Sequence, residues 1–284
     1  MNDVRTQTST APSAVRTPRR RLHRWGALVA AVALTASACG GDNGDTAADG
    51  GDGDLGLIQS GTLTVCSDVP YPPFDTRDGD TYTGFDGDLI NEIASRLELD
   101  VSLRDQAFEG LQSGLALNSQ QCDLVSAAMT ITEEREQNLD FSEGYYDSKQ
   151  SLLVPEDSDI ESIEDLDGVQ VAVQQGTTGK TYAEENAPEG AELVTFPSDG
   201  EMYTAIKAGQ IGAILQDLPV NLSHEQDGGF KVVETYDTGE QYGFGFREEG
   251  SDALQEAVNG ALQDMRDDGT YDEIYNKYFA TDAE

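Results

Sequence analysis

The sequence predicts an α/β protein with two lobes, each an open, mostly parallel sheet flanked by helices. From Leu55 onward, short apolar runs of strand character alternate with amphipathic segments of helical period. Such alternation is typical of parallel sheets whose successive strands are connected by helices. The series occurs twice, before and after Asp147, and a short final segment follows. We therefore expect two lobes, each with ligand-facing loops at the carboxyl ends of its strands.

The first series extends over residues 62–129. It begins with a strand at 62–66 (TLTVC), which the turn-rich residues 70–84 follow. Residues 85–97 carry apolar side chains at positions 85, 89, 90, 93, 94 and 97, which is helical spacing. A strand at 101–103, a helix at 110–117 and a strand at 123–129 complete the series.

The second series comprises residues 152–233, and a mostly helical segment ends the chain. Residues 169–173 (VQVAV) have the composition of a buried strand, and residues 178–186 are expected to form a helix. The other expected elements are strands at 152–154, 192–196, 213–216, 231–233 and 242–246, and helices at 198–208, after Pro219 and over 253–278.

The charge of the chain is strongly negative. Its 284 residues include 17 basic and 54 acidic side chains, a formal net charge of −37 at pH 7. Such a surface repels phosphate backbones and anionic lipid headgroups, which argues against nucleic-acid binding and peripheral membrane adhesion. His224 is the one histidine outside the basic N-terminal segment, and the chain has three cysteines, which argues against a His-based zinc site. We expect no metal site and no cofactor. We expect His224 to be solvated, because it lies in a polar stretch at 223–226 (SHEQ).

Residues 1–38 are predicted to be an export signal peptide. Residues 16–24 form a basic region, and residues 25–38 form an apolar run of 14 residues. That run is too short for an ordinary transmembrane helix, which needs about 20 residues. The arginines at 19–21 also fit, more weakly, a twin-arginine signal.

The segment that ends the apolar run resembles a bacterial lipobox, in which a cysteine is lipidated and becomes the new N-terminus. Small residues lead to Cys39, although Ala36 stands where leucine is usual. A plain secretory signal with an Ala-x-Ala cleavage site is the alternative. Residues 39–54 would then be the lipidated cysteine and a flexible tether, because glycine and like-charged aspartate favour an extended, solvated chain.

Six blocks in chain order resemble the family 3 solute-binding proteins of ABC importers, which bind polar amino acids. The block at 84–89 (GFDGDL) is similar to the family pattern Gly-aromatic-Asp-aliphatic-Asp-Leu, with Gly87 in the aliphatic position. The other blocks are Asp68-x-x-Tyr71-x-Pro73-Phe74, Met129-Thr130-Ile131-Thr132-x-x-Arg135 with Asp140-Phe141-Ser142, Gln175-Gly176-Thr177-Thr178, Leu215-Gln216-Asp217, and Asp268-Gly269-Thr270-Tyr271 with Lys277-Tyr278-Phe279.

The resemblance implies a two-lobed clamp of the type II periplasmic-binding-protein fold with two hinge crossovers. Lobe one would comprise residues 55–147 plus 243–284, and lobe two residues 152–239. The implied function is an extracytoplasmic lipoprotein that captures a polar amino acid, basic or amide in its side chain, and delivers it to an ABC permease. A partner ATPase would supply the energy. The protein would act as a monomer, in the periplasm or at the outer face of the cytoplasmic membrane, and only its lipid would touch the membrane.

The resemblance also implies which residues hold the charged groups of the ligand. Arg135 would bind the carboxylate, because its planar fork matches two oxygens. The Thr130 hydroxyl and backbone amides near Ala128 would assist. Thr178 would add donors at a helix start, and Asp217 would accept the ammonium group. A solvated helix face for the arginine, and strand or cap roles for the others, are the structural alternatives.

Three further residues are implied at the side-chain end of the pocket. Tyr71 and Phe108 would sandwich the side chain between their apolar faces. Asp68 would favour a ligand with a donor group there. Plain packing for the two aromatic residues, and a turn-capping carboxylate for the aspartate, are the alternatives.

Two arguments about Cys66 and Cys122 conflict. An even pair of cysteines in an oxidising exterior favours a disulfide. The implied fold puts the two residues on neighbouring parallel strands, however, offset by about four residues or roughly 13 Å, which is beyond bridging range. The geometric argument weighs slightly more, and the balance is against a disulfide.

Two other functions on the same fold stay open. One is an enzyme similar to the cyclohexadienyl dehydratases, which act on prephenate-like acids, and the other is a sensory subunit that reports its ligand to a membrane kinase. Asp68 and Asp217 favour an amino acid over prephenate, so we expect no enzymatic activity. The run at 174–181 (QQGTTGKT) is similar to a Walker A loop but has Gln174 in the first glycine position, which argues against an NTPase.

Overall fold

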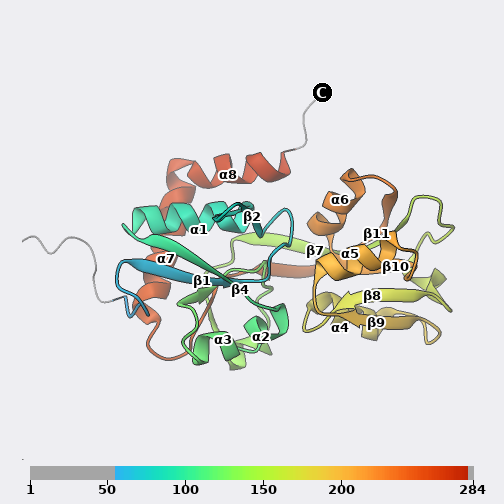
Figure 1. The fold of residues 1–284 in the computed structure, drawn as a ribbon, viewed down its shortest axis with the longest axis horizontal. Helices are drawn as coiled ribbons and strands as arrows, with labels where there is room; N and C mark the ends of the chain where they lie inside the picture. The colour runs from blue at the N-terminus through green and yellow to red at the C-terminus, as the bar shows by residue number, and fades with distance from the viewer. Residues whose placement is uncertain (1–54, 281–284) are drawn as a thin grey trace, which may run out of the picture. The chain divides into compact units, whose positions relative to one another are not determined.

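The computed structural model describes residues 55–280 of the chain. The predicted signal peptide, Cys39 and the tether lie outside the described residues. Figure 1 shows the two sheets of the described part, each with its own helices. Within residues 55–280, every helix is too short or too polar to cross a membrane.

Five strands form the first sheet, in the order β4 (Asp100–Asp105), β1 (Thr62–Ser67), β5 (Leu124–Val125), β12 (Gly245–Phe246) and β6 (Asp140–Phe141). β1 pairs in parallel with both β4 and β5. β12 pairs antiparallel with both β5 and β6. The sheet is therefore mixed. Its parallel part, β4, β1 and β5, comes from the predicted strand–helix series. Its antiparallel part depends on β12, which lies much later in the chain.

Alternation along β1 gives the first sheet two apolar faces. Leu63 and Val65 pack with the apolar sides of α1 (Phe85–Arg96) and α7 (Asp252–Asp268). Cys66 packs on the opposite face, with α2 (Phe108–Gln112) and α3 (Leu115–Asn118). In Figure 1, α1 and α8 (Thr270–Phe279) lie on one side of the sheet and α2 and α3 on the other. The small hairpin of β2 (Thr76–Asp78) and β3 (Thr81–Thr83) precedes α1.

Two of the expected helices are each divided by a glycine. The helix predicted at 110–117 is two short helices separated at Gly114, whose φ is 73°. The long helical segment predicted at 253–278 is α7 and α8, separated at Gly269 with φ 87°. Residues with a Cβ avoid this left-handed backbone region, and a helix cannot continue through it.

The second sheet has the order β11 (Phe230–Tyr242), β7 (Tyr146–Pro155), β10 (Ala213–Asp217), β8 (Gln170–Gln174) and β9 (Glu192–Phe196). β8 pairs in parallel with β9 and β10, and β7 pairs antiparallel with β10 and β11. Val171 and Val173 pack on the face that contacts α4 (Thr178–Asn186), and Ala172 packs on the face that contacts α5 (Asp199–Lys207). The helix expected after Pro219 is α6 (Leu218–Gln226), and 3-10 turns occur at Arg135–Gln137 and Ile163–Leu166.

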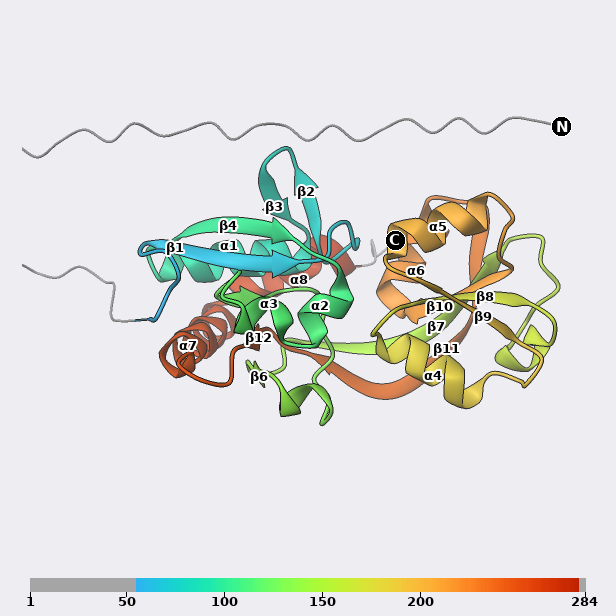
Figure 2. The same ribbon diagram turned by 60° about the horizontal axis from the view of Figure 1, so that its bottom comes forward.

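Two long strands, β7 and β11, pass from the second sheet toward the first, as Figure 2 shows. They pair from Pro155 opposite Phe230 to Tyr146 opposite Tyr242. At the near end, Thr130 of the first lobe forms an isolated bridge with Tyr242. The predicted fold class, a two-lobed clamp with two hinge crossovers, is confirmed. The predicted lobe boundaries remain a proposal. The strands of the two sheets fall within them except β7 and β11, which extend beyond the predicted range of the second lobe.

Aromatic side chains join the last helix to the crossing strands. The rings of Tyr146 (β7) and Tyr242 (β11) stack with centroids 5.5 Å apart. Phe279 of α8 lies 4.9 Å from Tyr146 and 5.0 Å from Phe85 of α1. The C-terminal helix therefore packs against the hinge as well as against the first lobe.

The prediction that Cys66 and Cys122 form no disulfide is wrong. The two cysteines are bonded, with their Cα atoms 5.7 Å apart. The predicted strand at 123–129 was extended too far. β5 comprises only Leu124 and Val125, and the latter is opposite Cys66. Cys122 lies in the loop between α3 and β5, two residues before the strand, and belongs to the apolar cluster on the Cys66 side of the sheet. An offset measured along an ideal strand therefore does not apply to it.

The expectation that His224 is solvated was also wrong. Its side chain is buried on the inner face of α6, one helical turn after the buried Val220. The imidazole Nε2 is 2.8 Å from Asp199 Oδ1, and the ring stacks on Tyr203 with centroids 3.8 Å apart. Polar neighbours in the sequence predicted exposure, but helical spacing decides which face a residue occupies.

Candidate functional site

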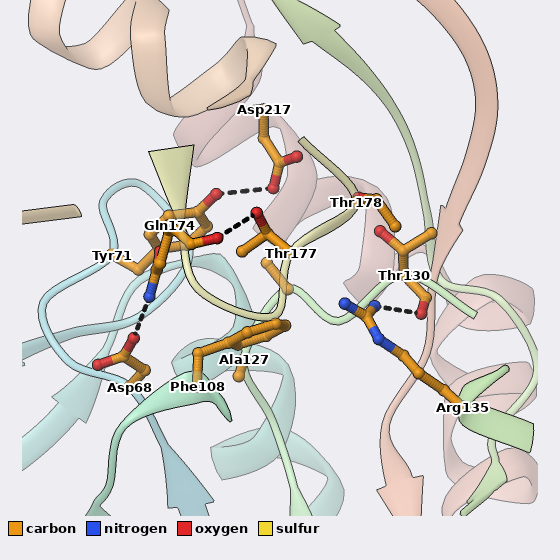
Figure 3. A pocket seen from close by; sticks show the side chains of 11 residues that line it. Asp68, Tyr71, Phe108, Ala127, Thr130, Arg135, Gln174, Thr177, Thr178 and Asp217 are labelled. Atoms are coloured by element: carbon orange, nitrogen blue, oxygen red, sulfur yellow. Dashed lines mark hydrogen bonds between the residues drawn. The ribbon is translucent and has the colours of Figure 1, made fainter. Parts of the chain in front are cut away.

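A cavity lies between the two lobes, and we call it the interlobe cavity. It brings together all eight residues predicted to contact a ligand. Figure 3 shows that its walls come from both lobes. The lining residues are Asp68, Tyr71, Phe108, Ala127, Ala128, Thr130 and Arg135 of the first lobe, and Gln174, Thr177, Thr178 and Asp217 of the second.

Two side chains of the first-lobe wall follow the carboxyl end of β1. Asp68 comes directly after the strand, and Tyr71 is held by reciprocal backbone hydrogen bonds with Asp75, of 2.7 and 2.9 Å. Because the carboxyl ends of parallel strands meet at one edge of a sheet, this position is where an open α/β sheet binds ligands. The Tyr71 ring also stacks on Phe74, with centroids 6.4 Å apart, so packing and cavity roles coexist in one residue.

Arg135 is the buried cation of the cavity, with 5% of its surface exposed. Its guanidinium carbon lies 5.2 Å from the ring centroid of Phe108, a cation–π arrangement. Nη1 donates to the carbonyl of Thr130 at 2.6 Å, and Nη2 donates across the cavity to the carbonyl of Gly176 at 3.0 Å. Burial lowers the pKa of Arg135 to about 10, so the side chain is still a cation at neutral pH.

Ala127 and Ala128 form a turn in which Ala128 has a φ of 43°. The amide of Ala128 donates to the buried Asp86 Oδ2 at 2.9 Å. Asp86 belongs to the 84–89 block, and burial raises its pKa to about 6. Because an amide has one proton, the hydrogen bond to Asp86 uses the donor of Ala128, and another amide of this turn has to serve any bound anion.

The second-lobe wall is built by the turn between β8 and α4. Gln174 ends β8, and Gly176, with φ 80°, reverses the chain. Thr177 caps α4, because its hydroxyl accepts the amide proton of Lys180 at 3.1 Å, and Thr178 is the first residue of the helix. The positive end of a helix therefore faces the cavity beside Arg135.

Asp217 ends β10 at the opposite side of the cavity and is 8% exposed. Tyr71 donates its hydroxyl proton to Oδ2 at 2.7 Å, and Gln150 donates to Oδ1 at 2.6 Å. Burial, together with the nearby negative charge of Glu240, raises the pKa of Asp217 to about 6. A cation that binds here would relieve both effects.

Asp68 accepts a hydrogen bond from Gln174 Nε2 at 2.7 Å. Burial raises the pKa of Asp68 to about 6, against the opposing effect of that hydrogen bond. With the Tyr71–Asp217 and Arg135–Gly176 contacts, this is the third hydrogen bond that joins the two lobes across the cavity. Figure 3 shows two of these three contacts, Asp68 with Gln174 and Tyr71 with Asp217.

Sequence reasoning missed several residues at the site. Ala127, Gln174 and Thr177 line the cavity, and Gln150 and Glu240 hydrogen bond to residues that line it. Gln174 was within reach of prediction, because it directly follows the strand predicted at 169–173 and precedes the Gln-Gly-Thr-Thr block. Glu240 carried no such signal. Among residues 55–280, no three His, Cys, Asp or Glu side chains converge as a metal site would require.

The arrangement suits a ligand with charges at separate points. A buried cation and a helix start at one end match an anion, and the buried carboxylate of Asp217 matches a cation. The rings of Tyr71 and Phe108 offer apolar faces between them, and Asp68 offers an acceptor at a third point. A zwitterion with a polar side chain meets all of these groups.

The sequence model of the bacterial extracellular solute-binding proteins, family 3, matches residues 63–281. The chain belongs to this family. Among the curated relatives of this family 3 protein, the histidine-binding periplasmic protein of Escherichia coli (strain K12) is 32% identical over 234 residues, which are 78% of this chain and 88% of the relative. The ABC transporter glutamine-binding protein of Bacillus subtilis (strain 168) is 31% identical over 263 residues, 90% of this chain and 95% of the relative.

The solved structures include proteins that resemble this family member over most of its length. An ancestral arginine-binding protein bound to glutamine is 38% identical, with a TM-score of 0.73, and the match covers 78% of this chain and 100% of that one. This structural neighbour therefore has the same kind of fold. The predicted family and the predicted type II fold are both confirmed.

Proposed function

We propose that this solute-binding protein captures a polar amino acid with a basic or amide side chain in the interlobe cavity and delivers it to an ABC permease. The observation that carries the proposal is the joint presence of Arg135, Asp217 and Asp68 in one cavity. The histidine, glutamine and arginine that name the relatives described above support the same ligand class.

In this proposal each charged group of the ligand binds a residue of opposite charge. Arg135 binds the carboxylate with its fork, and the hydroxyls of Thr130 and Thr178 assist. Asp217 accepts the ammonium group. Ligand contacts with the second lobe form only when the lobes close, so binding favours the closed state.

At the other end, Tyr71 and Phe108 hold the ligand's side chain between their rings, and Asp68 accepts its polar head. A carboxylate there favours arginine, lysine, histidine and glutamine over acidic or aliphatic amino acids. A thermal-shift screen of the twenty amino acids identifies the ligand, because one that binds only the native state raises the apparent stability.

Arg135→Ala tests the pocket. Calorimetry with the amino acid found in the screen should show an affinity at least about 100-fold lower, because the substitution leaves the ligand carboxylate without its charged partner. Arg104→Ala, on the exposed edge strand β4, is the matched control and should bind as the wild type does. Near-normal binding by the Arg135 variant would refute the assignment.

We further propose that residues 1–38 are removed as a signal peptide, that Cys39 is lipidated, and that residues 39–54 tether the lobes to the outer face of the membrane. The lipobox-like sequence before Cys39 supports this. A Cys39→Ala variant should appear in the medium or as free periplasmic protein. Its retention in the membrane fraction would contradict lipidation.

The proposed partners are the permease subunits with their ATPase, and the protein itself is proposed to be a monomer without catalytic activity. Light scattering tests the monomer. We propose that the protein has no dehydratase activity, because the two carboxylates of prephenate would meet the carboxylates of Asp68 and Asp217 in the cavity. Incubation with prephenate tests this. A sensory role would be favoured if ligand-loaded protein bound a membrane kinase rather than a permease.

A further inference from the structure

Glu240 occupies an unusual place on the hinge. It lies on β11, where the pairing with β7 is interrupted between Tyr236 and Glu240, and Gly239 before it has a φ of 66°. Regular pairing resumes with Glu240 opposite Ser148. Thr130 bridges to Tyr242, two residues further along β11, so Glu240 and Tyr242 project from the same face of the strand. The interruption thus brings a carboxylate to the edge of the interlobe cavity.

Three donors from three parts of the molecule converge on one oxygen of this carboxylate. Glu240 Oε2 accepts from Thr130 Oγ1 at 3.2 Å and from Thr178 Oγ1 at 3.2 Å. Gln150 Nε2 of the other crossing strand donates to the same atom at 2.9 Å. The two threonines belong to opposite lobes and line the cavity, whereas Glu240 lies behind them, in the adjoining cleft on the far side of Arg135.

These contacts compete with the contacts proposed for a ligand. A threonine hydroxyl has one proton, and a hydroxyl that donates it to Glu240 cannot donate it to a second acceptor. Glu240 therefore holds the two hydroxyl protons that an anion in the cavity would use. Its negative charge also lies one hydroxyl away from the place where Arg135 would hold that anion, and like charges at this separation repel.

We propose that Glu240 is a specificity-determining residue that opposes the ligand's carboxylate. Resting on the proposed function, the inference is that an amino acid binds only by drawing the hydroxyl protons of Thr130 and Thr178 away from Glu240 and by accepting the repulsion of its charge. The residue lowers the affinity for any anion at the Arg135 end while leaving the ammonium end attractive. It thus widens the preference for ligands with net positive charge and disfavours a further negative charge.

Glu240→Gln tests the inference, because it removes the charge and keeps the size of the side chain. Affinities are measured by calorimetry for two probes: whichever of L-arginine, L-lysine, L-histidine and L-glutamine binds the wild type most tightly, and the α-carboxamide of that amino acid. The carboxamide keeps the ammonium group and the side chain but carries no negative charge. Glu234→Gln is the matched control, on the same strand, where the carboxylate accepts from the Ile163 amide and the Tyr236 hydroxyl.

Glu240→Gln should bind the amino acid at least about tenfold more tightly, because the substitution removes the Coulomb repulsion between the Glu240 carboxylate and the ligand's carboxylate. The carboxamide should bind as it does to the wild type, or less tightly, because its ammonium group loses an attractive charge. Glu234→Gln should leave both affinities unchanged. A shift of the same factor for both probes would mean that Glu240 acts on lobe closure alone, and would overturn the inference, as would an unchanged or weaker affinity for the amino acid. Failure of every amino acid to bind the wild type would instead overturn the proposed function.

Discussion

Asp68→Asn should remove the pH dependence of the preference for a cationic over a neutral amino acid. Burial raises the pKa of Asp68 to about 6. The carboxyl group is therefore about nine-tenths ionised at pH 7 and about one-tenth ionised at pH 5. Only the ionised form attracts a cationic side chain. The affinity for L-arginine relative to L-glutamine should thus fall about tenfold between pH 7 and pH 5, because acidification protonates the acceptor.

The ratio of two ligands is the informative quantity, because Asp217 also has a pKa raised to about 6. Both ligands carry the same α-ammonium group, so protonation of Asp217 affects both and cancels in the ratio. The side-chain amide of glutamine does not titrate in this range. The remaining pH dependence of the ratio therefore reports on groups near the side-chain end.

Calorimetry at pH 5, 6 and 7 measures the two affinities for the wild type, Asp68→Asn and the control Asp105→Asn. Asp105 is an exposed carboxylate close enough to Asp68 to raise its pKa, but it does not line the cavity. The control should keep a pH-dependent ratio, shifted toward lower pH because the Asp105 charge raises the pKa of Asp68. Asp68→Asn should have a flat ratio and bind L-arginine at least about tenfold more weakly at pH 7. A flat ratio in the wild type, or a slope that survives in Asp68→Asn, would refute the reasoning.

Three further predictions concern stability and packing. Replacing Cys66 and Cys122 by serine should lower the free energy of unfolding by about 4 kcal/mol, given 56 residues of sequence separation; an unchanged denaturation midpoint after reduction of the wild type would contradict this. His224→Ala leaves a cavity and removes one of the hydrogen-bond partners of the buried Asp199 carboxylate, which keeps the bond from Gln216, so thermal unfolding should show a loss of about 2–4 kcal/mol; a loss below that of a surface substitution would argue against a structural role. Gly179→Ala places a Cβ 2.7 Å from the Gln150 side-chain oxygen, and should cost about 1–3 kcal/mol and weaken ligand binding; full stability in urea titration would show that α4 moves freely.

The cavity residues were predicted through the resemblance to the family, and the geometry of strand ends explains why these residues meet. Asp68 follows β1 and Asp217 ends β10, and the carboxyl ends of parallel strands converge on one edge. Gln174 ends β8 at the same edge and could have been added by the same argument. Apolar runs predicted the strands, and the family blocks implied which of the residues near them contact a ligand.

The errors arose where local context does not determine position. Cys122 was assigned to a strand that begins two residues later, and this difference changes a separation of roughly 13 Å into a bond. His224 has polar neighbours, yet the turn of α6 directs it inward. Glu240 depends on an interruption in strand pairing, and such irregularities follow from how two strands meet rather than from the residues of either one.

The position of β12 has a consequence for the order in which the lobes form. β12 lies between β5 and β6, although about a hundred residues of chain separate it from them, and those residues include the whole second sheet. The first sheet is therefore incomplete until nearly all of the chain is available, whereas the second is built from one continuous stretch. Non-local pairing of this kind slows folding. In refolding followed by pulsed hydrogen exchange, we expect amides of β8 and β10 to become protected before those of β5. The reverse order would show that the first sheet forms without waiting for β12.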